Sequence, residues 1–146
     1  MDSKELALRI RRDTIEMVHA AHASHIGSVL SVADMLAVLY TDVLNVDPGF
    51  PQMEARDRFV LSKGHAGAAV YAVLAECGFF PVEELKKYYM DGSVYSGHVS
   101  GKGVPGVELS TGSLGHGACV ACGMALAAKR MHKRHQVYTI VGDGEC

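Results

Sequence analysis

The stretch VYTIVGDGEC, residues 137–146, joins an apolar run to a short acidic loop flanked by glycines. The apolar part has the length and composition of a buried strand. Asp143 follows it between two glycines, and α/β folds collect ligands at the carboxyl ends of their strands. A carboxylate there suits a divalent cation that bridges to phosphate. An ordinary Asx turn is the structural alternative.

The rest of the chain alternates strand and helix patterns. A second apolar run, RFVLS at 58–62, predicts another buried strand. Helices are predicted over 4–22, over 32–44 with Ser31 as N-cap, over 66–78 with Gly78 as the stop, over 81–90 from Pro81, and over 113–134. The segment SHIGSVLS, 24–31, is predicted to break the first two helices apart. This alternation predicts an α/β fold with a parallel sheet flanked by helices.

Composition bounds the kind of protein. The chain has 146 residues, so we expect one domain over 1–146. Hydrophobic residues make up 49% and the formal net charge is −2, which argues against nucleic-acid binding. No apolar run approaches the roughly 20 residues that span a membrane. The charged opening is unlike a signal peptide and the four cysteines are not spaced as a disulfide scaffold, so we expect a cytoplasmic protein.

Two glycine-rich regions suggest a binding site. Residues 91–112 are rich in Gly and Ser without helical periodicity, and a loop of that length is usually functional or disordered. Its GKGVPG, 101–106, spells a dinucleotide fingerprint but follows no strand. TGSLGHG, 111–117, precedes a predicted helix, whose free N–H groups and positive dipole end favour anions. A tight helix entry is the structural alternative.

His116, Cys119 and Cys122 fall at intervals of three and so share roughly one helix face. This spacing admits a soft metal site or a redox pair. A closed zinc site needs a fourth ligand, which no second cysteine pair supplies. We therefore favour cysteines that pack where the helix approaches the sheet.

Three of the eight histidines lie in breaks flanked by glycine or serine: His25, His65 and His98. A single such histidine is best interpreted as structural. Three in similar settings favour a polar pocket, because histidine donates hydrogen bonds to hydroxyls and phosphates and moves protons near neutral pH.

The order of these motifs resembles the N-terminal part of a transketolase, and in particular the separate N-terminal subunit of split transketolases. The resemblance runs from about residue 8 to residue 146. It is carried by SHIGSVLSVADMLAVLY, DRFVLSKGHA, YAVLAECGFFP, SGHVSGKGVPGVELSTGSLGHG, GMALAAK and VGDGE. The implied fold is the domain that holds the diphosphate of thiamine diphosphate. The implied activity is transfer of a two-carbon ketol unit from a ketose phosphate to an aldose phosphate, with thiamine diphosphate and Mg²⁺ as cofactors.

The resemblance also implies residue roles. Asp143 would bind the magnesium ion and Gly144 would contact a phosphate oxygen. His65 would contact the diphosphate and line the substrate channel. His25 and His98 would hydrogen-bond the hydroxyls of the donor sugar and assist proton transfers.

Gly112 and Leu114 would hold the aminopyrimidine of the cofactor with backbone groups. The glutamate that activates the pyrimidine belongs to a second domain, so we expect a partner chain that carries the pyrimidine-binding domain, and a dimer of heterodimers. The remaining metal ligands would lie beyond Cys146. On this basis the domain is incomplete at its C-terminal end and lacks roughly 120 residues or more.

The chain departs from the family pattern at positions that bear on the identity of the sugar substrate more than on the cofactor. Where the family usually has His-Pro-Gly, this chain has HIGS, and GHVS replaces a commoner GHP. LGQG becomes LGHG, which places His116 beside the expected site. An unusual ketose is therefore plausible. Two alternatives stay open: a non-catalytic truncated paralogue that binds partners, and a subunit of another thiamine-diphosphate enzyme, a synthase or dehydrogenase.

Overall fold

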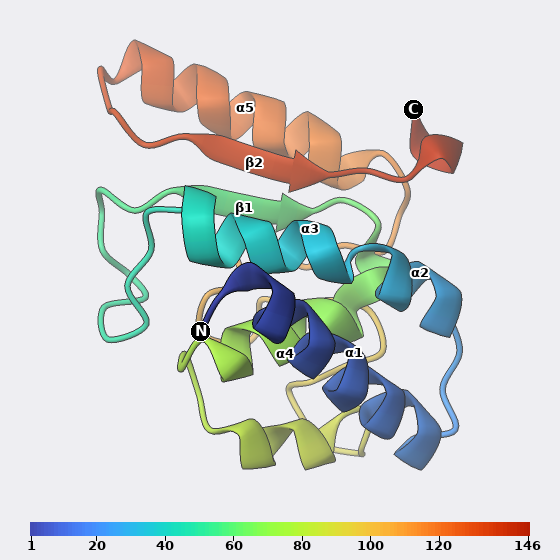
Figure 1. Ribbon diagram of the computed structural model, residues 1–146. Helices are drawn as coiled ribbons and strands as arrows, with labels where there is room; N and C mark the ends of the chain where they lie inside the picture. Colours follow the sequence, from blue (N-terminus) through green and yellow to red (C-terminus); the bar gives the residue numbers. More distant parts are fainter.

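The fold is a small parallel sheet between two helical layers, seen in the computed structural model, which describes residues 1–146 (Figure 1). The strands are β1 (Arg58–Leu61) and β2 (Val137–Ile140), paired in parallel with Arg58 opposite Val137 and Leu61 opposite Ile140. The helices are α1 (Ser3–Ala20), α2 (Ile26–Ser31), α3 (Ala33–Val38), α4 (Gly67–Glu76) and α5 (His116–Arg130). The predicted α/β fold with a parallel sheet is confirmed.

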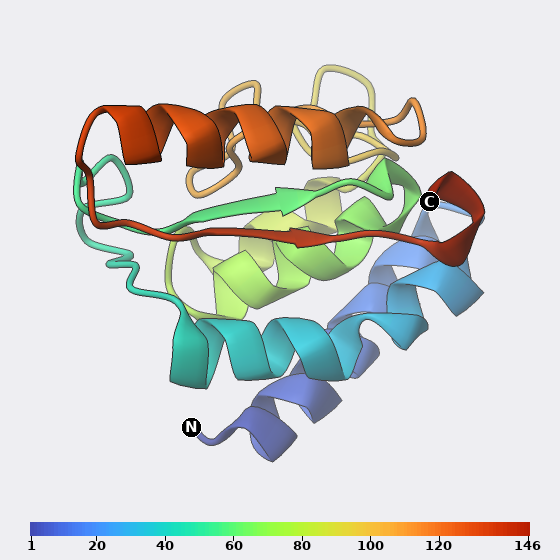
Figure 2. The same cartoon turned by 90° about the horizontal axis from the view of Figure 1, so that it is seen from above.

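One face of the sheet carries nearly all of the hydrophobic core. Figure 2 shows α5 on one side of the strands and α1 to α4 on the other. Every residue from Gly67 to Ala75 of α4 is buried, whereas α1 buries a stripe that includes Leu6 and Ile10. α4 is therefore the central helix of its layer, and α1 is an amphipathic helix that covers it.

The other face of the sheet is covered by α5 alone. Its buried residues are all small: Gly117, Ala121 and Ala128. Small residues let the helix backbone approach the strands closely, so α5 lies near the sheet without burying large side chains.

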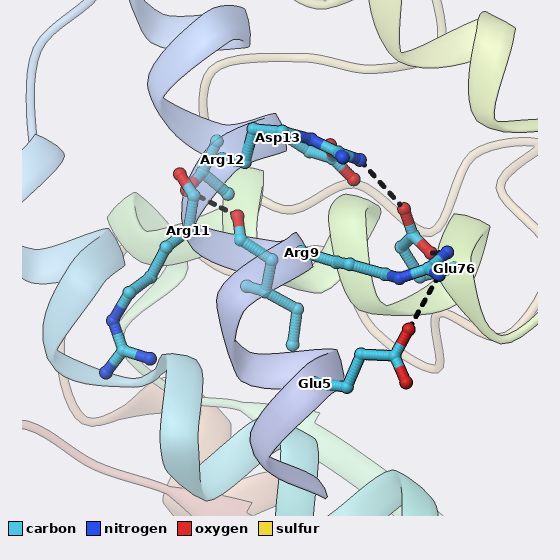
Figure 3. A network of polar contacts seen from close by, with 8 residues as sticks. Glu5, Arg9, Arg11, Arg12, Asp13 and Glu76 are labelled. Atoms are coloured by element: carbon cyan, nitrogen blue, oxygen red, sulfur yellow. Dashed lines mark hydrogen bonds and ion pairs between the residues drawn. The ribbon is translucent and has the colours of Figure 1, made fainter. Parts of the chain in front are cut away.

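Polar contacts fasten α1 to the end of α4 (Figure 3). Arg9 donates a hydrogen bond to Glu76 at 3.1 Å, and Arg12 forms an ion pair with it at 3.5 Å. Arg12 also pairs with the buried Asp13 at 2.8 Å. Two carboxyls thus lie close together at this junction and are neutralised in part by two arginines.

Several predicted elements differ in detail. The first helix is interrupted as predicted, since the chain is not helical between Ala20 and Ile26, but SHIGSVLS then forms a short helix, α2. Ser31 donates its hydroxyl to the carbonyl of Ser28 instead of capping the next helix. The helix expected from Pro81 is a 3-10 helix at Val82–Lys87, and it ends before Tyr88, whose φ of −55° and ψ of 130° are not helical. A π-helical turn at Leu39–Val43 extends α3. No helix combines the length and the apolar composition that crossing a membrane requires.

Candidate cofactor and substrate site

The three histidines singled out in the sequence come together at one end of the sheet. The ring centroids of His25 and His65 are 5.2 Å apart, and those of His25 and His98 are 5.7 Å apart. They come from three separate segments: the residue before α2, the 3-10 turn Gly64–Ala66 that follows β1, and the long loop before α5. The predicted polar cluster of histidines is therefore present.

His25 sits in a strained backbone conformation. Its φ of 71° is in the left-handed region, which is uncommon for a residue with a Cβ. The residue is exposed and precedes the first turn of α2. Three residues outside the cluster, His22, Tyr89 and His132, also have a positive φ, so this conformation alone does not mark a functional residue.

His65 is held in its neutral form at pH 7. Burial lowers the pKa of His65 below its ordinary value. Positive charge on His25 or Lys63 lowers this pKa further, whereas Glu145 opposes the shift. A neutral imidazole has one donor and one acceptor nitrogen, so His65 can both give and take a hydrogen bond.

The loop with His98 is docked directly on the start of α4. The Val99 N–H donates to the carbonyl of Gly64 at 2.9 Å. A Cβ at Gly67 would lie 2.5 Å from the Val99 nitrogen, so only glycine allows this approach. The Thr111 hydroxyl donates to the carbonyl of Leu61 and ties the far end of the loop to β1. Both ends of the loop are thereby fixed beside the sheet.

Gly112 and Leu114 lie on either side of Ser113 in the entry to α5. A Cβ at Gly112 would lie 3.5 Å from the imidazole of His98, so this glycine is next to the histidine cluster. Leu114 is 54% exposed, and its side chain is free of the core. The structure places Gly112 beside the histidine cluster and leaves the Leu114 side chain exposed.

A carboxylate is held beside the start of α5 by two glycine amides. Glu145 accepts a hydrogen bond from the Gly115 N–H at 3.2 Å and a second from the Gly142 N–H at 3.4 Å. A Cβ at Gly117 would lie 2.5 Å from the Cα of Ser62, so the helix can start this close to β1 only with glycine there. These two amides therefore donate to an anionic oxygen beside the start of α5, where the helix dipole favours negative charge.

Asp143 and Gly144 belong to the short 3-10 turn Asp143–Glu145 that follows β2. Both are exposed, and a Cβ at Gly144 would meet no atom within 4 Å. No group of three His, Cys, Asp or Glu side chains is arranged to hold a metal ion. Asp143 can therefore offer one carboxylate ligand from this chain.

The expectation for the two cysteines of α5 was wrong. Cys119 and Cys122 are exposed, and the sheet-facing positions belong to Gly117 and Ala121. His116, the first residue of α5, is exposed as well. The interval of three places these side chains on the helix surface that faces away from the strands.

Two residues of the site were missed from the sequence. Lys63 lies between the end of α2 and the turn that follows β2. Its Nζ is 3.5 Å from the Ser31 hydroxyl, and its Cδ is 3.9 Å from a Cβ built on Gly142. Glu145 accepts a hydrogen bond from the N–H of Gly115, the residue before α5. Lys63 could have been found from the sequence, because a lysine that directly follows a predicted buried strand, as in LSKGH, is a candidate for binding anions. Nothing in the sequence indicates that Glu145 folds back.

The histidine cluster is an open edge and not an enclosed cavity. A cavity of about 680 Å³ lies between α1 and the segment Val82–Met90, and none of the three histidines lines it. A ligand bound at the histidines would contact this chain on one side only.

Comparison with known proteins identifies the family of this chain. The family model described as "Transketolase, thiamine diphosphate binding domain" matches residues 2–146. The chain belongs to the transketolase family. The resemblance predicted from the sequence motifs is therefore confirmed.

Relatives in this family include separate transketolase subunits. The chain is 41% identical over 145 residues to the 6-deoxy-6-sulfo-D-fructose transketolase subunit SqwG of Clostridium sp. (strain MSTE9), covering 99% of this chain and 53% of that protein. It is 44% identical over 135 residues to an apulose-4-phosphate transketolase subunit of Phocaeicola vulgatus, covering 92% of this chain and 48% of that protein. The chain thus spans about half the length of these curated relatives.

Solved structures give the same assignment. Transketolase from Campylobacter jejuni superposes with a TM-score of 0.90 at 36% identity, over 98% of this chain and 24% of that one. Transketolase from Leishmania mexicana gives 0.89 at 33% identity, over 99% of this chain and 23% of that one. The fold is the N-terminal part of the transketolase thiamine diphosphate-binding domain.

Proposed function

We propose that this chain is the N-terminal part of a transketolase subunit that transfers a two-carbon ketol unit from a ketose phosphate to an aldose phosphate. The observation that carries the proposal is the meeting of His25, His65 and His98 next to an anion-accepting helix start. Both features are needed together, because the cofactor of this family carries an anionic diphosphate and its substrates are polyhydroxylated.

The residues at the start of α5 fit the diphosphate of thiamine diphosphate. The amides of Gly115 and Gly142 already donate to a carboxylate, and phosphate oxygens could replace it. Gly144 is open to close approach by a ligand. Gly112 and Leu114 would hold the aminopyrimidine through backbone groups, and His65 would contact the diphosphate. When bound, the cofactor supplies a carbon nucleophile and an electron sink.

Asp143 is proposed as a ligand of Mg²⁺. Its exposed carboxylate follows β2, where a hard cation could bridge to the diphosphate. Because this chain offers no group of three ligands, the other ligands would come from phosphate, water and residues beyond 146. The thiamine diphosphate domain would continue there.

The histidines would act on the sugar. His25 and His98 are exposed and could donate hydrogen bonds to hydroxyls near the reacting carbon. A neutral His65 could accept or donate without adding positive charge beside them. These side chains would orient the donor and hold or move protons at its hydroxyl oxygens.

A partner chain would complete the active site. Relatives covered to about half their length are named as transketolase subunits, which supports a separate subunit with the pyrimidine-binding domain. We propose a dimer of heterodimers in the cytoplasm. The sugars in those relatives' names also support an unusual ketose as the donor for this enzyme.

Histidine variants test this proposal in the full-length subunit reconstituted with its partner, thiamine diphosphate and Mg²⁺. The variants are His25→Asn, which tolerates the left-handed backbone, His65→Ala and His98→Ala. Each should lower kcat/KM for ketol transfer by about 100-fold, the usual contribution of a positioned proton-transfer group. His19→Ala, on the exposed surface of α1, is the matched control and should leave kcat/KM unchanged. Full turnover in all three site variants would reject the assignment.

A further inference from the structure

The hydroxyl of Tyr71 is a polar group placed deep in the apolar layer. Tyr71 lies in the middle of α4 and is 0% exposed. Its ring packs against those of Tyr95 and Tyr88, with centroids 5.5 Å and 6.3 Å away. A hydroxyl buried among aromatic rings is costly unless it makes hydrogen bonds.

Both hydrogen bonds of this hydroxyl go to the loop that carries His98. Tyr71 donates to the carbonyl of His98 at 3.1 Å and accepts from the Ser100 N–H at 2.9 Å. Burial raises the pKa of Tyr71 above its ordinary value. The hydroxyl therefore keeps its proton at neutral pH and remains a donor. The Tyr71 hydroxyl of α4 therefore holds the loop at two points, the His98 carbonyl and the Ser100 N–H.

The peptide between His98 and Val99 is also held by a main-chain bond, since the Val99 N–H donates to the Gly64 carbonyl at 2.9 Å. No helix or strand lies between Lys87 and His116, so the loop lacks a regular backbone ladder. Ser96 donates its hydroxyl to the same His98 carbonyl at 2.6 Å, but it is exposed and belongs to the loop itself. Tyr71 is thus the side chain outside the loop that holds the His98 peptide.

We propose that Tyr71 is a positioning residue: its hydroxyl fixes the main chain at His98 and so keeps the His98 imidazole next to His25. This inference rests on the proposed role of His98 toward the donor sugar. Tyr71 itself lies behind the loop and would not contact the sugar. Its removal should weaken donor binding and turnover while leaving the diphosphate site at α5 intact.

The test compares Tyr71→Phe with Tyr95→Phe in the full-length protein, assembled with its partner. Both substitutions remove one hydroxyl from the same aromatic cluster, but the Tyr95 hydroxyl makes no hydrogen bond within the chain. Tyr71→Phe should lower kcat/KM for the ketose by about tenfold, the usual weight of one hydrogen bond. The dissociation constant of thiamine diphosphate should not change. Hydrogen exchange at the Ser100 amide should become about tenfold faster.

The outcomes separate this inference from the proposed function. Equal kcat/KM and equal Ser100 exchange in the two Phe variants would overturn the positioning role. If the wild-type complex shows no ketol transfer, the proposed function fails, and Ser100 exchange alone decides whether Tyr71 holds the loop. If Tyr71→Phe does not fold, hydrogen exchange in the wild-type protein decides: protection of the Ser100 amide supports its bond to the Tyr71 hydroxyl, and exchange at the rate of an unprotected loop amide refutes it.

Discussion

α4 and α5 are both rich in small residues, and they flank the same two strands from opposite sides, yet they are buried very differently. α4 is buried from Gly67 to Ala75, whereas α5 buries only Gly117, Ala121 and Ala128. The same kind of sequence therefore serves two purposes. α4 is covered by α1 and the His98 loop and anchors the fold, while α5 contacts the sheet with one narrow face.

Because α4 and α5 are buried so differently, the parts of the site that they hold should respond differently to mutation. His98 depends on α4 through Tyr71 and through Val99, which rests on Gly67. The proposed phosphate contacts depend on the first turn of α5. Damage to α4 should unfold the chain and remove the histidines with it, whereas damage to the outer face of α5 should be tolerated.

The largest effect should come from truncating a core leucine. Leu74→Ala removes a side chain that is 0% exposed on α4, and it should lower the free energy of unfolding by about 2–5 kcal/mol through lost burial and the remaining cavity. Leu126→Ala removes the same atoms from a position on α5 that is 53% exposed, and the change should stay within about 0.5 kcal/mol. Urea unfolding of both variants measures the contrast. Equal losses would show that α5 is packed in solution as tightly as α4.

Two glycines of α5 should give effects of opposite sign. Gly117→Ala forces a methyl group against the Ser62 backbone, 2.5 Å away, and should cost about 1–3 kcal/mol of unfolding free energy. Gly123 is exposed, and a Cβ there meets nothing within 4 Å. Gly123→Ala should therefore stabilise the chain by about 0.5–1 kcal/mol through helix propensity.

Thermal unfolding of the two variants checks this pair. A destabilised Gly117→Ala with a stabilised Gly123→Ala would confirm that α5 approaches the sheet on one face only. Stabilisation by both would mean that the helix can move away from β1 at little cost, and the close contact at Ser62 would then be unimportant.

The sequence predicted the helices and strands that can be recognised from the spacing of apolar residues within one segment. β1, β2, α1 and α4 follow runs of apolar residues, and the α/β arrangement follows from their alternation. The histidine cluster was predicted from similar loop settings, not from distances. Tyr71 was missed because a tyrosine at a helical core position looks the same whether or not its hydroxyl reaches a distant loop.

The cysteines of α5 show where local patterns are insufficient. An interval of three places Cys119 and Cys122 on one face, but it does not say whether that face is toward the strands. The contact between Gly117 and Ser62 sets the rotation of the helix, and this contact joins residues 55 positions apart. The fold-back of Glu145 onto Gly115 is another long-range contact. Such contacts are decided by the assembled fold.

The smallest expected effect is on the pH dependence of stability, and it distinguishes the C-terminal ends of α4 and α5. α4 ends at Glu76, whose side chain is 4% exposed and contacts Arg9 and Arg12. Burial raises the pKa of Glu76, and the neighbouring Asp13 raises it further. A carboxyl whose pKa is higher in the folded state binds more protons there than in the unfolded state. The free energy of unfolding therefore falls as pH rises from below the ordinary pKa through the raised one.

Glu76→Gln removes this dependence because an amide does not titrate. Between pH 4 and 7 the variant should lose less unfolding free energy than the wild type, and at pH 7 it should be more stable by under about 1 kcal/mol, since Arg9 and Arg12 already offset part of the cost. Lys129→Gln at the exposed end of α5 should leave the pH profile unchanged. Urea unfolding of all three proteins across this pH range measures the slopes. A steeper loss in Glu76→Gln would mean that the arginines outweigh burial, and that the junction of α1 and α4 is held by its ion pairs.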